Sequence, residues 1–563
     1  SGNWYSFCIQ LSKKIMLIGR KKGVILMQRQ KRKALWLIGF LSLTLLLATG
    51  CSTAKKATSS THIRYALAAE PESIDPRMST SLSASTVQAQ LFEGLTTLDE
   101  KNRPVAAAAE KWEISSDGLK YVFTLRAGLR WSSGEPVTAH DFEYAWKTGL
   151  SPELASPNAY MLYCLKNGEA YATKKAGMGQ VGVRAKDDRT LEVELERPTA
   201  YFLALTAFHA YYPVHKKTAA ADSKWANQPQ TVIANGPFKL VSWVKSSRME
   251  LAKNENYWDQ GKVKSAKIDL YLLDNSSTAI SMFESGQLDM GDSIPPSEVP
   301  RLVKEGKVRI YPFLGTVYVS FNVTKPPFDN PKVRKAFSLA IDRAAITDKL
   351  LRGGQSPALA FVPSGIADAA ANADFRTQGG SLLQDNDVSS ARRLLAEAGF
   401  PDGKGFPAVS FLFNTSESNK VVAEALQEMW KKNLGVQVMV TNQEWKVYWD
   451  SLDKHDFQVA RESWSGDYPD PLTFLDLFVS GGSNNAADYR NPQYDKLIAE
   501  AQQGLDPAQR MQRLHAAEKI LLEDAVIAPV FFQTNPVLLR PQVKGVIRSI
   551  LGVPYLKEAY LEP

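Results

Sequence analysis

Apolar and polar residues alternate in some segments of the chain, and in others the apolar residues recur with the period of a helix. The alternation in YVFTL (121–125) and LEVEL (191–195) predicts two strands. Residues 330–354 predict one long helix, because their apolar residues fall on one face. Asn330 is the expected cap of that helix, and Gly353 is its expected end.

Two later segments add to this pattern. SARRLLAEAGF (390–400) predicts a helix that ends at a glycine, and 419–440 predicts a helix, a turn and a strand with alternating valines. Strands and helices thus mix along the chain, which favours an α/β or mixed α+β fold with more than one lobe. The chain has 563 residues, too many for one hydrophobic core, and we expect two or three domains.

The N-terminal region has the anatomy of a targeting segment. MQRQKRK (27–33) is basic, and ALWLIGFLSLTLLLA (34–48) is apolar over the length of a signal peptide, which is short for a membrane span. Small residues then precede Cys51, as in a bacterial lipobox. We interpret 27–50 as a lipoprotein signal peptide, Cys51 as the lipidated residue and 51–61 as a flexible tether. The alternative is an uncleaved anchor helix, and both interpretations place the body outside the cytoplasm, held at a membrane.

The positive charge of the chain belongs to this leader. The formal net charge is +8, but residues 1–50 carry nine Lys or Arg and no acidic residue, which leaves −1 for the rest. We therefore expect no nucleic-acid partner, although a basic chain would otherwise suggest one. We interpret residues 1–26 as an upstream extension and exclude them from fold reasoning.

Cysteine usage leaves no internal disulfide. Cys8 lies in the leader and Cys51 is the predicted lipid site, so Cys164 is the only thiol of the body. Its apolar surroundings, AYMLYCLKN, indicate a buried structural thiol rather than a nucleophile.

Motifs of catalysis and of metal or cofactor binding do not support an enzyme. The six histidines form no HExxH or Cys/His cluster, and the chain has no Walker A loop and no GxSxG elbow. One GxGxxG occurs in AGMGQVG (176–182), but a strand-like segment follows it where a dinucleotide site needs a helix, so we interpret it as a turn. We expect no catalytic residues, no metal and no cofactor.

Seven segments, in order, resemble a known family. They are AEKWEISSDGLKYVFTLRAGLRWSSGEPVTAHDFEYAWK (109–147), NGPFKLVSWV (235–244), NYWD (256–259), FESGQLDM (283–290), KPPFDNPKVRKAFSLAIDR (325–343), NQEWKVYWD (442–450) and VARESWSGDYPDP (459–471). The chain resembles the bacterial extracytoplasmic solute-binding proteins of family 5, which serve oligopeptide ABC importers. The resemblance covers roughly residues 62–563 and places the protein outside the cytoplasm as a lipoprotein of the cell membrane.

The resemblance implies a periplasmic-binding-protein-like fold with two lobes, a hinge and an extra domain, the three-domain type called class II or cluster C. Lobe I would combine residues 62–91, 213–314 and 535–563. The extra domain would be 92–212, and lobe II would be 315–534. The strands that cross between the two lobes would form the hinge.

The resemblance also implies ligand-binding residues for a peptide, which is a zwitterion with a regular backbone. Asp467 would pair with the α-amino group, because a buried ammonium needs a counter-charge. The resemblance implies backbone amide contacts from Ser463, Ser465 and Gly466, and side-chain pockets lined by Trp464 and Trp445. It implies that Arg461 meets the ligand carboxylate and that Thr80 and Leu82 of lobe I contact the ligand backbone. Tyr160 and Tyr318 would be two further ligand contacts. The alternative is that Arg461 and Asp467 pair with charges of the protein and that Trp445 belongs to the core.

The chain departs from the family pattern at two places. Some members carry a disulfide whose cysteines would fall near Leu314 and at Ser465, and this chain has neither. The best-known peptide binders have a second arginine at the position of Leu452 in this chain. Lys454 lies nearby, but a lysine is a point charge and cannot form the two parallel hydrogen bonds that an arginine makes with a carboxylate.

Together these features predict a lipid-anchored, monomeric receptor that binds oligopeptides and delivers them to the permease of an ABC importer. Other ligands within the same fold are a dipeptide, a murein peptide, a peptide pheromone, or a nickel or haem complex. A signalling or adhesive surface lipoprotein, or an extracellular hydrolase, would be functions of a different class.

Overall fold

The computed structural model describes residues 62–370 and 372–562, which belong to one structural unit. The predicted upstream extension, signal peptide, lipid site Cys51 and tether lie outside the described residues. In the described part of the chain, none of the helices has both the length and the hydropathy needed to cross a membrane.

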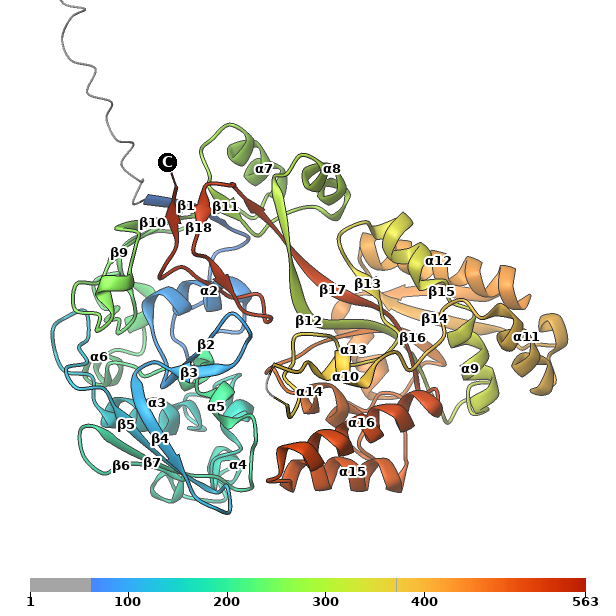
Figure 1. The fold of residues 1–563 in the computed structure, drawn as a ribbon, viewed down its shortest axis with the longest axis horizontal. Coiled ribbons are helices and arrows are strands. Elements are labelled where there is room, and N and C mark those ends of the chain that lie inside the picture. The colour runs from blue at the N-terminus through green and yellow to red at the C-terminus, as the bar shows by residue number, and fades with distance from the viewer. Residues whose placement is uncertain (1–61, 371, 563) are drawn as a thin grey trace, which may run out of the picture. The chain divides into compact units, whose positions relative to one another are not determined.

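An eleven-stranded sheet runs through this unit (Figure 1). Its strand order is β15-β14-β16-β12-β17-β11-β1-β10-β9-β8, and β13 pairs with β17 beside this path. The strands are β1 His62–Leu67, β8 Phe238–Val244, β9 Arg248–Lys253, β10 Lys267–Leu272, β11 Met290–Gly291, β12 Val308–Phe321, β13 Ser356–Pro357, β14 Val409–Asn414, β15 Val438–Gln443, β16 Val459–Ser465 and β17 Ile527–Leu539. Parallel pairs (β1 with β10, and β14 with β15 and β16) mix with antiparallel pairs, and the fold class is mixed α/β as predicted.

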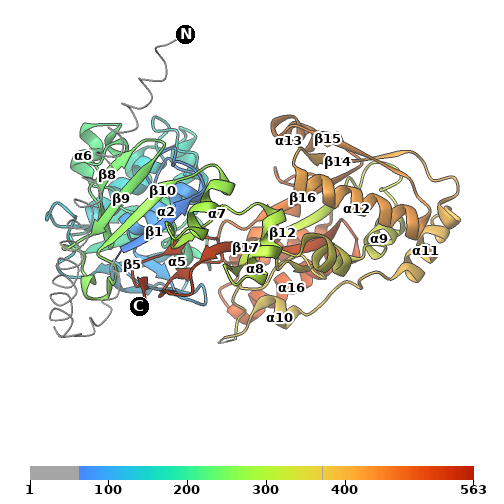
Figure 2. The same cartoon turned by 90° about the horizontal axis from the view of Figure 1, so that it is seen from above.

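The two longest strands, β12 and β17, connect the two ends of this sheet. Figures 1 and 2 show them running together from the half that contains β1 to the half that contains β14 and β16. Their antiparallel register slips between the pairs Pro312↔Thr534 and Thr316↔Phe532, so that three residues of β12 face one residue of β17. The predicted lobe junctions at 314/315 and 534/535 fall inside these continuous strands, and the domain boundaries stay predictions.

A separate four-stranded sheet is formed between residues 109 and 194, in the order β4-β5-β7-β6. Its strands are β4 Ala109–Ile114, β5 Lys120–Leu125, β6 Val183–Ala185 and β7 Thr190–Glu194. In β5 the side chains of Tyr121, Phe123 and Leu125 are buried on alternate positions, which confirms the strand predicted at 121–125. The strand predicted at 191–195 is likewise confirmed as β7.

Helices and short ladders complete the unit. The helices are α2 Leu82–Leu91, α3 Ala139–Gly149, α4 Gly168–Ala172, α5 Phe202–Leu205, α6 Lys216–Ala221, α7 Ser276–Glu284, α8 Val299–Lys304, α9 Pro331–Leu339, α10 Phe375–Gly379, α11 Val388–Glu397, α12 Glu417–Leu434, α13 Trp445–Asp453, α14 Leu472–Leu475, α15 Pro492–Gln503 and α16 Pro507–Glu523. The short strands are β2 Thr96–Leu98, β3 Pro104–Ala106, β18 Val543–Lys544, β19 Ile547–Arg548, β20 Pro554–Tyr555 and β21 Tyr560–Leu561. The helix predicted at 390–400 is confirmed as α11, and the predicted helix, turn and strand at 419–440 are confirmed as α12, Gly435 and β15.

The prediction of one long helix over 330–354 is wrong. Helix α9 ends at Leu339, and a separate helical segment covers Ala345–Leu351. Between them the Asp342 carboxylate accepts a hydrogen bond from the Ala345 N–H (2.8 Å) and caps the second segment. The break turns the Arg343 side chain into the core, where its Nε donates to the Pro529 carbonyl of β17 at 2.6 Å. This long-range contact outweighs the local helical pattern.

Replacing this buried arginine tests the packing account. Arg343 is fully buried, and its guanidinium donates to the Pro529 carbonyl at 2.6 Å and to the Ser338 carbonyl at 3.2 Å, so Arg343→Ala removes both hydrogen bonds and leaves a cavity in the core. We expect the free energy of unfolding to fall by about 3 kcal/mol in urea titrations. Arg393→Ala, on the exposed face of α11, is the control and should change it by about 0.5 kcal/mol or less. Equal unfolding midpoints for the two variants would contradict the role of Arg343.

Candidate ligand-binding site

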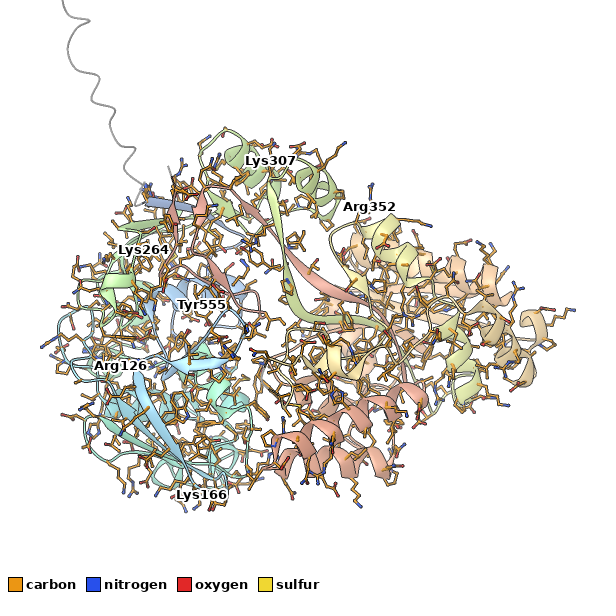
Figure 3. The ribbon with its side chains drawn as sticks, in the orientation of Figure 1. Arg126, Lys166, Lys264, Lys307, Arg352 and Tyr555 are labelled. Atoms are coloured by element: carbon orange, nitrogen blue, oxygen red, sulfur yellow. The ribbon has the colours of Figure 1, made fainter. Side chains whose placement is uncertain are left out.

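A cavity of about 710 Å³ lies between two walls that come from distant parts of the chain. One wall contains α4, α5 and the residues around Tyr160, and the other contains the end of β16, the loop after it and α14 (Figure 1). Figure 3 labels Lys166, which lies two residues before α4 and is not one of the residues that line the cavity. The volume is within the range of small-molecule sites, roughly 300–1,000 Å³.

The loop that carries Asp467 is held on both sides. Strand β16 pairs with β12 up to Ser465↔Gly315, and the Gly466 N–H then donates to the Leu314 carbonyl at 2.8 Å. A Cβ at Gly466 would lie 2.6 Å from Leu314 Cδ2, so only glycine fits this close approach. The Asp467 N–H donates to Thr473 Oγ1 at 3.0 Å. The backbone is therefore fixed where the Asp467 side chain enters the cavity.

The Asp467 carboxylate is partly buried and has no hydrogen-bond donor or cation within the described residues. Burial raises its pKa from the ordinary value of 3.8 to about 6. The charged form is thus destabilised in the free protein, and a cation placed beside it would remove that cost.

Aromatic side chains form much of the remaining lining. Trp464 lines the cavity, and its buried indole N–H has no acceptor among the described residues. Tyr160 also lines it and is 52% exposed, and partial burial followed by the nearby Asp467 charge raises its pKa. Tyr201 and Tyr468 stack across the two walls with ring centroids 4.0 Å apart. Such surfaces offer apolar area together with a few polar atoms.

The structure separates Arg461 from the cavity. Successive residues of a strand point to opposite faces, so Arg461 and Ser463 lie on one face of β16 and Trp464 on the other. The Arg461 guanidinium donates to Ser463 Oγ at 3.1 Å, its Nε has no acceptor in the described chain, and burial lowers its pKa. Neither Arg461 nor Asp467 forms an ion pair with another described residue, which disfavours the alternative in which protein charges neutralise them.

Two other predicted aromatic contacts lie elsewhere. Tyr318 is 3% exposed, its hydroxyl donates to Glu462 Oε2 at 3.3 Å, and it packs edge-on against Phe361, so it does not line this cavity. Trp445 begins α13, is 56% exposed and packs against Trp449. The alternative that placed Trp445 in the core is therefore wrong.

The predicted contacts from lobe I, Thr80 and Leu82, are exposed at the start of α2 and do not line this cavity, and neither does exposed Ser465. Cys164, predicted to be buried, is partly exposed in the cavity wall, because only its inner side packs against the core. Its sulfur lies 3.1 Å from the Tyr211 hydroxyl, and burial raises the thiol pKa to about 11. That shift agrees with an unreactive thiol.

Sequence reasoning missed Asp476, Arg197, Tyr201 and Tyr468, which also line the cavity. Asp476 was open to detection, because it is a lone charge in the apolar run LTFLDLFV (472–479). The other three carry no local signal. The described residues hold no cluster of three or more side chains suited to a metal ion.

Comparisons with known proteins agree on one family. A sequence profile for the bacterial extracellular solute-binding proteins, family 5 (middle region), matches residues 103–486. The chain belongs to this family. Its members are transport receptors, and on that ground the prediction that this protein is not an enzyme is confirmed.

The relatives and solved structures extend this result over almost the whole chain. The oligopeptide-binding protein OppA of Bacillus subtilis is 38% identical over 518 residues, which are 90% of this chain and 94% of the relative. An unliganded open form of the murein tripeptide-binding protein MppA matches with a TM-score of 0.79 and 36% identity, covering 90% of this chain and 98% of that chain. Haemophilus influenzae OppA in complex with the peptide RPPGFSPFR matches with a TM-score of 0.69 and 34% identity, covering 90% and 100%. The predicted periplasmic-binding-protein-like fold class is thereby confirmed.

The raised pKa of Asp467 has a consequence for stability. The folded state holds this proton more tightly than the unfolded state, so the carboxylate lowers stability as pH rises from about 4 to about 6, and the loss is complete above that. Asp467→Asn removes this cost, and we expect the ligand-free protein to gain about 1 kcal/mol in urea unfolding at pH 7.5. At pH 4 the variant and the parent should be nearly equal. A variant that is less stable at pH 7.5 would show that the carboxylate has a stabilising partner.

Proposed function

We propose that this protein is a lipid-anchored extracytoplasmic receptor that binds oligopeptides and delivers them to the permease of an ABC importer. The observation that carries the proposal is Asp467, a partly buried carboxylate that has no counter-charge among the described residues and faces a cavity of about 710 Å³. The names of the relatives, an oligopeptide-binding and a murein tripeptide-binding protein, support a peptide as the ligand.

A peptide supplies the cation that this carboxylate needs. Its α-ammonium group is largely protonated at pH 7, and it is present whatever the sequence of the peptide. An ion pair with Asp467 in the cavity would return the carboxylate to its charged form and recover the cost of its burial. One carboxylate can therefore recognise the N-terminus of many different peptides.

The backbone of β16 offers a place for the rest of the peptide. Strand β14 pairs with β16 only at Val459 and Ala460, so within the described part of the chain this edge of β16 has no partner strand from Arg461 to Ser465. An extended peptide can pair with such an edge through its main chain, independently of its side chains. We place the amide contacts of Ser463, Ser465 and Gly466 here.

Aromatic and charged side chains nearby would meet the variable and C-terminal parts of the ligand. Trp464 presents an indole N–H that has no acceptor in the described chain, and a ligand carbonyl would provide one. We assign the contact with the ligand carboxylate to Arg461, and contacts with ligand side chains to Trp445 and Tyr160. Thr80 and Leu82 would contact the ligand backbone. Tyr318 would act indirectly, by donating a hydrogen bond to Glu462.

Closure of the two lobes would bring the remaining contacts together. The chain resembles the unliganded open form of MppA more closely (TM-score 0.79) than the peptide complex of OppA (0.69), which supports an open arrangement. We place the hinge where the register of β12 and β17 slips, because β12 loses its pairing with β17 over three residues there and the two strands can change their angle at that point. On this proposal lobe I is 62–91, 213–314 and 535–563, the extra domain is 92–212 and lobe II is 315–534.

Blocking the α-amino group tests the recognition of the N-terminus. The protein, freed of bound ligand by unfolding and refolding, should bind a free tetrapeptide and should bind its N-acetylated form at least about 30-fold more weakly in calorimetry. Asp467→Asn should weaken the free peptide by a similar factor and leave the acetylated peptide unchanged, because the lost energy is that of one ion pair. Equal binding of both forms by the parent protein would contradict this role of Asp467.

The anchor is tested separately in the source cell. If Cys51 is the lipidated residue, Cys51→Ser should move the protein from the membrane fraction to the soluble fraction. Cys164→Ser is the matched control and should remain in the membrane fraction. Retention of the Cys51 variant in the membrane would favour the alternative, an uncleaved anchor helix.

A further inference from the structure

A second carboxylate faces the same cavity. Asp476 follows α14 at the start of a short 3-10 turn, Asp476–Phe478, and lines the cavity together with Asp467. Within the described residues its carboxylate accepts no hydrogen bond from another residue and forms no ion pair. The inference below rests on the proposed function, because it concerns the ligand of that same site.

The surroundings of Asp476 do not neutralise it. Burial, and then the charges of Asp467 and Asp470, raise its pKa to about 7, while Arg197 lowers it. Asp470 is already paired with Arg510 at 2.7 Å, and Arg197 makes no contact within 4.0 Å of Asp476. The charged and titratable groups that act on Asp476 or are influenced by it are Asp467, Asp470, Arg197, Tyr201, Tyr468 and Tyr494.

The two carboxylates need more positive charge than one α-ammonium supplies. If an ammonium pairs with Asp467, Asp476 still faces the filled cavity without a partner, and closure removes further water from it. Glu169 and Glu196 also line this cavity, and among its described lining residues Arg197 is the only basic one. The Trp464 indole N–H, buried and without an acceptor in the described chain, is a further polar group of this wall that the described residues leave unsatisfied.

We propose that Asp476 is a specificity-determining residue that binds a cationic side chain of the peptide, close to the α-ammonium held by Asp467. The preferred ligands are then peptides with lysine, arginine or ornithine near the N-terminus. The rest of the cavity remains tolerant, because its walls are largely aromatic and apolar.

A pair of peptides that differ in one charge tests this role. Lys-Ala-Ala and norleucine-Ala-Ala have side chains of similar length, but only lysine carries an ammonium. At pH 7.5 we expect the parent protein to bind Lys-Ala-Ala at least about tenfold more tightly in calorimetry. In Asp476→Asn we expect the preference for Lys-Ala-Ala to fall to about threefold or less. The affinity of this variant for norleucine-Ala-Ala should stay within about threefold of that of the parent protein.

Two controls separate Asp476 from general electrostatics. Glu169→Gln removes a carboxylate that lines the same cavity from the opposite wall and should keep the lysine preference. Lowering the pH to 5.5 should weaken the preference in the parent protein, because Asp476 is then largely protonated before binding. This second readout needs no variant and remains decisive if Asp476→Asn fails to fold.

Each outcome supports or overturns the inference. Equal binding of the two peptides by the parent protein overturns it, and the proposed function stands if acetylation of norleucine-Ala-Ala still weakens binding. A lysine preference that survives in Asp476→Asn but disappears in Glu169→Gln assigns the subsite to Glu169 and overturns the role of Asp476. If neither peptide binds, the proposed function and this inference fall together.

Discussion

The antiparallel pairing of β12 with β17 is the interaction on which the rest of the structure depends. These two strands carry one sheet from β8 at one end to β15 at the other, and β16 pairs directly with β12. The slip in their register lies next to Leu314, whose carbonyl holds the Gly466 N–H and whose own N–H donates to the Ile550 carbonyl. The irregular point of the sheet is thus joined to the loop that carries Asp467. A movement at this point would be transmitted to the candidate site through two backbone hydrogen bonds.

The candidate site keeps charge in a setting that does not favour it. Asp467 and Asp476 face one cavity, and burial is the main cause of the raised pKa of each. A protein optimised for stability alone would replace them, whereas a receptor for cations gains from carboxylates that a ligand can neutralise. On the opposite face of β16, Arg461 is a partly buried guanidinium without an anionic partner among the described residues. Unneutralised charges of both signs near one strand suit a zwitterionic ligand.

The sequence predicted those elements that depend on local pattern. Strands β5 and β7, helix α11 and the α12–β15 turn at Gly435 followed directly from periodicity and a capping glycine. The break after α9 was not predictable in this way, because it depends on a hydrogen bond from Arg343 to Pro529, 186 residues away. The site showed the same division. The family resemblance pointed to Asp467 and Trp464, but VARESWS (459–465) lacks the alternation that would have shown Arg461 and Trp464 to lie on opposite faces. Asp476 was missed because its proximity to Asp467 arises from the fold of the loop between them.

The central claim is that a peptide ammonium neutralises Asp467, and proton release on binding measures this most directly. Calorimetry at pH 6 in buffers of different ionisation enthalpy counts the protons that leave the protein when norleucine-Ala-Ala binds. Because the pKa of Asp467 is about 6 in the free protein and must fall beside an ammonium, we expect release of roughly half a proton, and clearly less in Asp467→Asn. Tight binding without any proton release, or with the same release in Asp467→Asn, would show that the ligand is not held by this carboxylate.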